Sequence, residues 1–241
     1  MEIVITMAGM GSRFQKAGYK EPKFMIKALG KTLFEWSMDS LVDFNDENTK
    51  YTFIVRKECD AKEFIESKMK NYNISNINVI EIDYLTDGQA TTCMLAKDNW
   101  DKQDELLIYN IDTYVEPHYL KRSDIAGDGF IPCFKADGDH WSFVKTNDSG
   151  EVIEIREKQR ISDNCTIGAY YFKTCELYEK MYNEYYDGER ELDNNEKYIA
   201  PIYNYMLEKK MNLYITDIPQ ERVHVLGTPD ELEEFIKNYK N

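Results

Sequence analysis

Residues 2–14 read EIVITMAGMGSRF. The stretch begins as an apolar run and passes directly into a glycine-rich loop. The apolar run spans residues 2–7, and its β-branched residues are typical of a strand buried on both faces, as the strands of parallel sheets are. The strands and helices expected next alternate along the chain: helix 33–44, strand 51–56, helix 61–72, strand 77–82, helix 89–100 and strand 105–111. This alternation predicts an α/β fold with a doubly wound, Rossmann-like and mainly parallel sheet.

The pattern changes after residue 126. Short strand-like runs alternate there with turn signals such as Asn147-Asp148-Ser149-Gly150, which predicts a small, antiparallel, β-rich insertion or lobe. The strands expected in this half are residues 130–135, 141–145, 152–156, 166–172, 213–218 and 222–226. Two tyrosine-rich helices are expected at 176–186 and 198–209, and a last helix should open at Thr228-Pro229, a favourable N-cap followed by proline.

The composition excludes several classes of protein. The 241 residues carry 30 Lys and Arg against 44 Asp and Glu, a net charge of −14, which argues against a nucleic-acid partner. No apolar run approaches the roughly 18 residues of a membrane span, and no signal peptide is recognisable, so a cytoplasmic protein is expected. The five cysteines are widely spaced without a CxxC pair, so neither a disulfide framework nor a zinc site is expected.

The charge is unevenly distributed along the chain. Residues 1–31 carry six Lys and Arg against two Glu, a net charge of +4, so the remaining 210 residues carry −18. The same 31 residues hold four of the twelve glycines. Glycine lets backbone N–H groups approach a ligand closely, and clustered cations attract anions, so this segment is predicted to bind an anion.

Two familiar glycine motifs do not fit this segment. The dinucleotide-binding pattern GxGxxG begins at Gly9 but has Phe14 in place of the third glycine, and the P-loop pattern ending at Gly30-Lys31-Thr32 has Met25 where glycine is required. The remaining interpretation is a loop, Gly9-x-Gly11-Ser12-Arg13, followed by Glu21-Pro22-Lys23. In it, loop amides hold a triphosphate while Arg13 and Lys23 neutralise its charge.

Several stretches together resemble the nucleotidyltransferases that activate sugar phosphates and related phosphates. In chain order, they are residues 7–14 (MAGMGSRF), 21–23 (EPK), 87–90 (DGQA), 109–112 (YNID), 157–158 (EK), 168–172 (GAYYF) and 226–229 (LGTP). The resemblance covers essentially the whole chain. It implies a single domain with the nucleotidyltransferase fold, with a nucleotide-binding half at 1–125 and an acceptor-binding half, including the β-rich lobe, at 126–241.

The resemblance also implies the reaction. A phosphate oxygen of a small phosphorylated acceptor attacks the α-phosphorus of a nucleoside triphosphate, and pyrophosphate leaves. The protein forms no covalent bond, so catalysis consists of positioning and charge stabilisation. Matching the motifs residue by residue gives Arg13 and Lys23 as catalytic residues. It gives Ala8, Gly9, Gly11, Ser12 and Gly88 as nucleotide-binding residues, Lys158 and Gly168 as acceptor-phosphate-binding residues, and Asp112 as a Mg²⁺ ligand.

One expected residue is missing from the matched pattern. In the family a second carboxylate usually precedes the Gly-Thr-Pro element and shares the metal, but here His224, Val225 and Leu226 precede it. His224 could replace the carboxylate, although Mg²⁺ prefers oxygen ligands. Asp217, in the preceding strand-like run, is the alternative carboxylate considered.

Within this family, the short chain resembles the cytidylyltransferases of capsule and other surface-polysaccharide pathways. This favours CTP as the nucleotide, with L-glutamine phosphate or a sugar phosphate as the acceptor and a CDP-activated product. Two alternatives remain open. One is a glycosyltransferase of the GT-A type that uses Asn110-Ile111-Asp112 or Asp137-Gly138-Asp139 as its metal motif. The other is a nucleotide-sensing module without turnover, which the missing carboxylate would explain.

Overall fold

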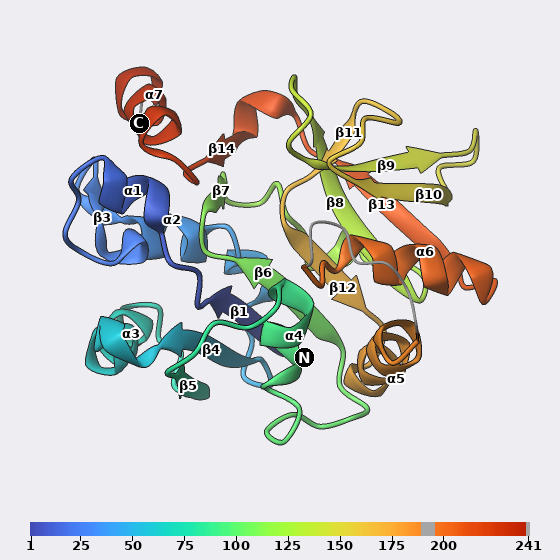
Figure 1. Cartoon of the computed structure of the whole chain (residues 1–241), viewed down its shortest axis with the longest axis horizontal. Coiled ribbons are helices and arrows are strands. Elements are labelled where there is room, and N and C mark those ends of the chain that lie inside the picture. The colour runs from blue at the N-terminus through green and yellow to red at the C-terminus, as the bar shows by residue number, and fades with distance from the viewer. Residues whose placement is uncertain (189–195, 240–241) are drawn as a thin grey trace.

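The computed structural model describes residues 1–188 and 196–239, in which one large sheet carries helices on both faces (Figure 1). The strands are β1 (Glu2–Met7), β2 (Lys27–Ala28), β3 (Lys31–Thr32), β4 (Lys50–Arg56), β5 (Ile77–Ile82), β6 (Leu106–Asn110), β7 (Thr113–Val115), β8 (Gly129–Lys135), β9 (Ser142–Thr146), β10 (Val152–Glu157), β11 (Asn164–Thr166), β12 (Ala169–Phe172), β13 (Leu213–Asp217) and β14 (Val223–Val225). The helices are α1 (Ser12–Lys16), α2 (Leu33–Asp39), α3 (Lys62–Asn71), α4 (Gln89–Met94), α5 (Cys175–Tyr186), α6 (Ala200–Glu208) and α7 (Pro229–Asn238), with a 3₁₀ turn at Lys23–Met25.

The central strand of the parallel half is β1, as its sequence predicts. It pairs in parallel with β4 on one side and β6 on the other, and β5 extends the sheet beyond β4. The expected α/β fold is therefore confirmed, and the carboxyl ends of β1, β4 and β6 lie together at one edge of the sheet. This is the edge at which ligands bind in open α/β sheets.

Side chains alternate between the two faces of β1 and build two separate cores. Ile3 and Ile5 pack with the residues of α2 and α3 on one face, and Val4 packs with those of α4, α5 and α6 on the other. All three side chains are fully buried. Because both faces are covered, the strand is apolar without interruption, which is the pattern seen in its sequence.

The β-rich half continues the same sheet. Strand β12 is antiparallel to β6 and also to β8, so it joins the parallel half to β8, β11, β9 and β10. The single strand expected at 166–172 is in fact two, β11 and β12, which are separated at Ile167-Gly168. Gly168 has a φ of +78° there, a left-handed conformation that glycine adopts without strain.

The end of the chain returns to its beginning. Strand β14 pairs antiparallel with β7, and α7 then packs beside α2, so that the C-terminal helix lies next to the N-terminal elements in Figure 1. Trp36 and Phe235 meet there with ring centroids 5.2 Å apart. In the described part of the chain, no helix combines the length and the apolar character that crossing a bilayer requires.

Replacing Gly168 with alanine tests the junction between the two halves of the sheet. A Cβ at Gly168 would collide with the side chain of Asn110, in addition to the left-handed backbone. We expect Gly168→Ala to lower the free energy of unfolding by about 2–4 kcal/mol in urea titrations. Gly150→Ala is the matched control, because Gly150 also has positive φ but no atom lies within 4 Å of its added Cβ. Equal losses in the two variants would contradict the predicted collision.

Candidate active site

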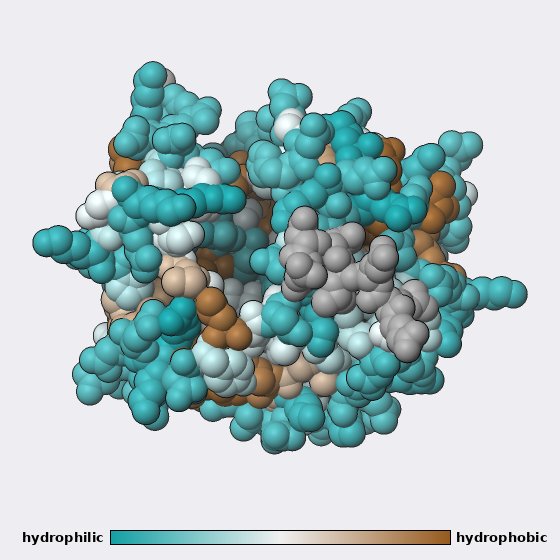
Figure 2. Space-filling model, in the orientation of Figure 1, coloured by the Kyte–Doolittle hydropathy of each residue, from teal (hydrophilic) through white to brown (hydrophobic). Residues whose placement is uncertain are grey.

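Two adjoining cavities open at the carboxyl ends of β1 and β6. They have volumes of about 730 and 610 Å³, and Figure 2 shows the hollow near the centre of this face. Both are lined by Gly9, Ser12, Arg13, Asp112 and Gly227. Three motifs that lie far apart in the sequence therefore meet at one place, and the glycine-rich loop borders both cavities.

The loop after β1 presents backbone donors to the cavities. The N–H groups of Gly9, Met10 and Gly11 have no hydrogen-bond acceptor among the described residues. Gly11 has a φ of +61° and precedes α1, while Ala8 is buried at the start of the loop. Free N–H groups beside a cavity are available to an anion.

An ion pair joins two of the predicted site residues. Lys23 Nζ lies 2.6 Å from Asp112 Oδ2, and the two side chains are 14% and 35% exposed. Lys23 begins a 3₁₀ turn after Pro22, and Asp112 lies two residues beyond the end of β6. The fold thus brings together a cation and a carboxylate that are 89 residues apart in the chain.

The second cavity is rich in cations. Its lining includes Arg13, Lys20, Lys23 and Arg56. Arg13 forms no salt bridge within residues 1–188 and 196–239, whereas Arg56 Nη2 lies 2.8 Å from Glu58 Oε2. The sequence identified the basic segment but not Arg56, whose place at the end of the neighbouring strand β4 becomes clear only from the pairing of β1 with β4.

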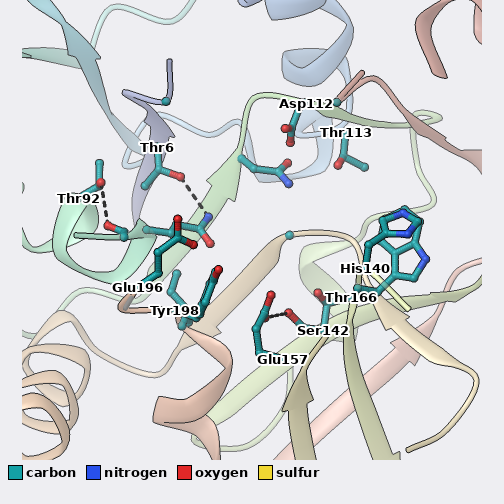
Figure 3. A pocket seen from close by; sticks show the side chains of 18 of the residues that line it. Thr6, Thr92, Asp112, Thr113, His140, Ser142, Glu157, Thr166, Glu196 and Tyr198 are labelled. Atoms are coloured by element: carbon teal, nitrogen blue, oxygen red, sulfur yellow. Dashed lines mark hydrogen bonds between the residues drawn. The ribbon is translucent and has the colours of Figure 1, made fainter. Parts of the chain in front are cut away.

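One side of the larger cavity is lined by neutral polar side chains. Gln89 Nε2 donates to Thr6 Oγ1 at 3.1 Å, and the hydroxyls of Thr86 and Thr92 are 2.6 Å apart (Figure 3). Gly88 also lies in this lining, and a Cβ there would overlap the backbone of Lys197. Close packing against Lys197 therefore explains why residue 88 is glycine, whether or not it contacts a nucleotide.

The opposite side of the larger cavity comes from the β-rich half. Tyr170 donates to Ser142 Oγ at 3.2 Å, and Ser142 in turn donates to Glu157, as Figure 3 shows for the latter pair. Lys158 Nζ donates to the hydroxyl of Tyr198 at 2.6 Å. Burial lowers the pKa of Lys158, but the bond to Tyr198 and nearby negative charge outweigh it and raise the pKa overall, so Lys158 stays cationic. Gly168 completes this side.

The structure places both substitutes suggested for the missing carboxylate outside the two cavities. His224 Nε2 lies 3.3 Å from Glu116 Oε1, and its ring stacks on Tyr114 with centroids 5.3 Å apart, so it belongs to an aromatic cluster and lines neither cavity. Asp217 is 55% exposed, lies 3.9 Å from Lys135 Nζ, and is also absent from both linings. Neither residue accompanies Asp112.

A different carboxylate lies beside Asp112. Glu231, in the first turn of α7, lines the larger cavity, and its Oε2 atom is buried without a hydrogen-bond partner among the described residues. A Cβ placed on Gly227 would lie 3.2 Å from Glu231 Oε2, 3.6 Å from Asp112 Oδ2 and 4.0 Å from Lys23 Nζ. Glu231 could not be recognised as a site residue from the sequence, because Thr228-x-x-Glu231 is also an ordinary helix-capping pattern.

The second acidic motif considered for a glycosyltransferase lies elsewhere. Asp137-Gly138-Asp139 is an exposed turn outside both linings, and Asp139 Oδ1 lies 3.5 Å from Arg160 Nε. Asn110 and Asp112, by contrast, line both cavities. Of the two acidic motifs, only Asn110-Ile111-Asp112 is at the site.

Comparison with known proteins places the chain among nucleotidyltransferases. The nucleoside-diphosphate-sugar pyrophosphorylase from Vibrio cholerae RC9 is 37% identical, with 98% of this chain and 100% of that chain covered and a TM-score of 0.88. The inositol-1-phosphate CTP transferase from T. maritima shares the fold at 16% identity, with 100% and 97% covered and a TM-score of 0.75. No protein-family model matches the chain, and no curated protein does.

The structural place of His224 predicts a pH dependence of stability. Burial lowers the pKa of His224, although Glu116 opposes the effect, so the unfolded chain binds a proton more readily than the folded protein. The stability that neutral His224 provides is present above about pH 6.5 and is lost as the pH falls through its folded pKa. In urea titrations, we expect wild type to lose more stability than His224→Phe between pH 7.5 and 5.5. Parallel losses would contradict this account.

Proposed function

Because the chain belongs to the sugar-phosphate nucleotidyltransferase family, we propose that it transfers a nucleoside monophosphate from CTP to a small phosphorylated acceptor. In this reaction, a phosphate oxygen of the acceptor forms a bond to the α-phosphorus of CTP, the bond from that phosphorus to the β-phosphate oxygen breaks, and pyrophosphate leaves. The proposed product is a CDP-activated compound for capsule or other surface polysaccharide.

The observation that supports this reaction best is the position of Asp112, which is paired with Lys23 and lines two unlike cavities. The smaller cavity has four basic side chains beside three carboxylates, and its basic groups suit a triphosphate tail. The larger cavity has neutral polar groups on one side and Lys158 on the other. The larger cavity falls in the size range of small-molecule sites. A nucleotide and an acceptor could therefore approach the pair from different directions.

The chain's own groups would stabilise the charge that develops during transfer. We assign Arg13 and the free amides of Gly9–Gly11 to the β- and γ-phosphates, with Ala8 and Ser12 framing the loop and Lys23 next to the α-phosphate. Negative charge grows on the departing pyrophosphate, and fixed cations in a confined site stabilise it more than water does. Arg56, at the end of β4 and paired with Glu58, lines the same cavity.

Mg²⁺ fits the oxygen donors at this site. Asp112 lies at the carboxyl end of β6, and the buried Oε2 of Glu231 near it lacks a partner among the described residues. A Mg²⁺ ion held there would supply positive charge that neutralises part of the charge of the phosphates. We assign Asp112 as a ligand.

The acceptor is assigned to the half made of residues 126–241. Lys158, held cationic by Tyr198, and the backbone at Gly168 would bind the acceptor phosphate and direct it toward the α-phosphorus. Glu157 and Ser142 lie beside them and would contact the rest of the acceptor. L-glutamine phosphate and sugar phosphates are the two acceptors we propose to test.

Pyrophosphate release distinguishes this function from its alternatives. The assay combines the protein with Mg²⁺, each of the four ribonucleoside triphosphates, and a panel containing L-glutamine phosphate and hexose 1-phosphates. We expect release with CTP and one acceptor class. Release with another triphosphate only would overturn the assigned base, and binding of nucleotides without any release would favour a sensing module. Transfer from a nucleotide sugar without pyrophosphate would favour a glycosyltransferase.

Substitutions of the ion pair test the assigned site. Lys23→Ala removes the charge next to the α-phosphate, and Asp112→Asn removes a metal ligand, so we expect each to reduce kcat by about 10²-fold or more. Lys27→Ala is the control, because Lys27 is an exposed lysine four residues on that lines neither cavity. Turnover of either site variant at the rate of the control would contradict the assignment.

A further inference from the structure

The carboxylate of Glu231 is not fully hydrogen-bonded in the structure. Its Oε2 atom is buried and has no hydrogen-bond partner among the described residues, and it faces the region occupied by Asp112 Oδ2. Burying a carboxylate oxygen without a partner destabilises a fold, and a second carboxylate nearby adds repulsion. An unsatisfied buried group in a native structure calls for an explanation.

The helix α2 shows what the same sequence pattern does elsewhere in this chain. Thr32 caps α2 by accepting from the N–H of Glu35, and Glu35 turns back to accept from the N–H of Thr32 at 2.9 Å. In α7, Thr228 accepts from the N–H of Glu231 at 3.2 Å, but Glu231 makes no return bond to Thr228. The capping box is closed in α2 and only half formed in α7.

The path of the chain explains why Glu231 reaches the site. Leu226 N–H donates to the carbonyl oxygen of Asp112 at 2.7 Å, which fixes the end of β14 beside the end of β6. Val225 and Leu226 supply no side-chain oxygen there, and Leu226 is fully buried. Gly227 follows without a side chain, and the space it leaves is bordered by Glu231, Asp112 and Lys23.

We infer that Glu231 is the second carboxylate ligand of the Mg²⁺ site, provided from the first turn of α7 in place of a residue before the Gly-Thr-Pro element. The inference rests on the proposed function. Mg²⁺ takes one or two carboxylates together with phosphate oxygens and water, so Asp112 and Glu231 suffice as protein ligands. The absence of a carboxylate at 224–226 is then a change of position and does not indicate lost activity.

Metal binding and turnover, measured on the same variants, test this inference. The first measurement is the Kd for Mn²⁺, by electron paramagnetic resonance, of the full-length protein saturated with the triphosphate that supports turnover, or with CTP if none does. The second is the Mg²⁺ concentration that gives half-maximal pyrophosphate release. We expect Glu231→Gln to raise both by about ten-fold or more, with a smaller effect on kcat at saturating Mg²⁺.

Asp230→Asn is the matched control, since Asp230 is an exposed carboxylate in the same first turn of α7. It changes the charge at the helix N-terminus equally but should leave both metal measurements unchanged. If Glu231 only stabilised the helix, Glu231→Gln would lower the melting temperature in EDTA and would not weaken Mn²⁺ binding. We expect the opposite, because the variant replaces a carboxylate oxygen that is buried without a partner among the described residues.

The outcomes separate this inference from the proposed function. Wild-type turnover with unchanged Mn²⁺ binding in Glu231→Gln would overturn the role of Glu231 and leave the transferase intact. Loss of Mn²⁺ binding in Glu231→Gln, in a protein that releases no pyrophosphate with any substrate, would support the metal site and overturn the proposed reaction.

Discussion

The ion pair between Lys23 and Asp112 is the contact on which the site depends. Each partner follows a different strand of the parallel half, Lys23 after the β1 loop and Asp112 after β6, so their 2.6 Å separation requires that β1 and β6 be adjacent and in register. The carbonyl oxygen of Asp112 also accepts a hydrogen bond from the N–H of Leu226, the residue after β14. The pair is therefore the point at which the beginning, middle and end of the chain meet.

Glycine is required at this meeting point for reasons of space. Gly88 lies against the backbone of Lys197, Gly168 lies against the side chain of Asn110, and Gly227 borders the carboxylates. A motif search marks such glycines as ligand contacts. In this structure the first two are equally explained by the close approach of one half of the chain to the other, which shapes the larger cavity before any ligand contacts it.

Periodicity in the sequence predicted the parallel half well because its inner strands β1, β4 and β6 are buried on both faces, and each contains a continuous buried run. It predicted residues 2–7 and 77–82 as strands with the bounds observed for β1 and β5. It failed at 166–172, because the turn at Gly168 interrupts the run in space without interrupting its apolar character. It also missed β7, a three-residue strand whose only described partner, β14, is more than 100 residues away. The motif residues that line the cavities could be named from the sequence. Glu231 and Arg56 also line them but could not be named, because their positions depend on pairings between distant segments.

The structure shows where the basic and acidic side chains lie around the two cavities. A net charge of −14 repels polyanions in general, yet Arg13, Lys20, Lys23 and Arg56 all line the smaller cavity. The larger cavity carries Glu157 and Glu196 on the side of the β-rich half. A long polyanion would meet the acidic exterior along most of its length, whereas a triphosphate is short enough to lie within the cationic cavity alone. The basic residues that line the smaller cavity, together with Lys158 in the larger one, are therefore local exceptions to the acidic character of the chain, and their reach matches a short polyphosphate better than a long one.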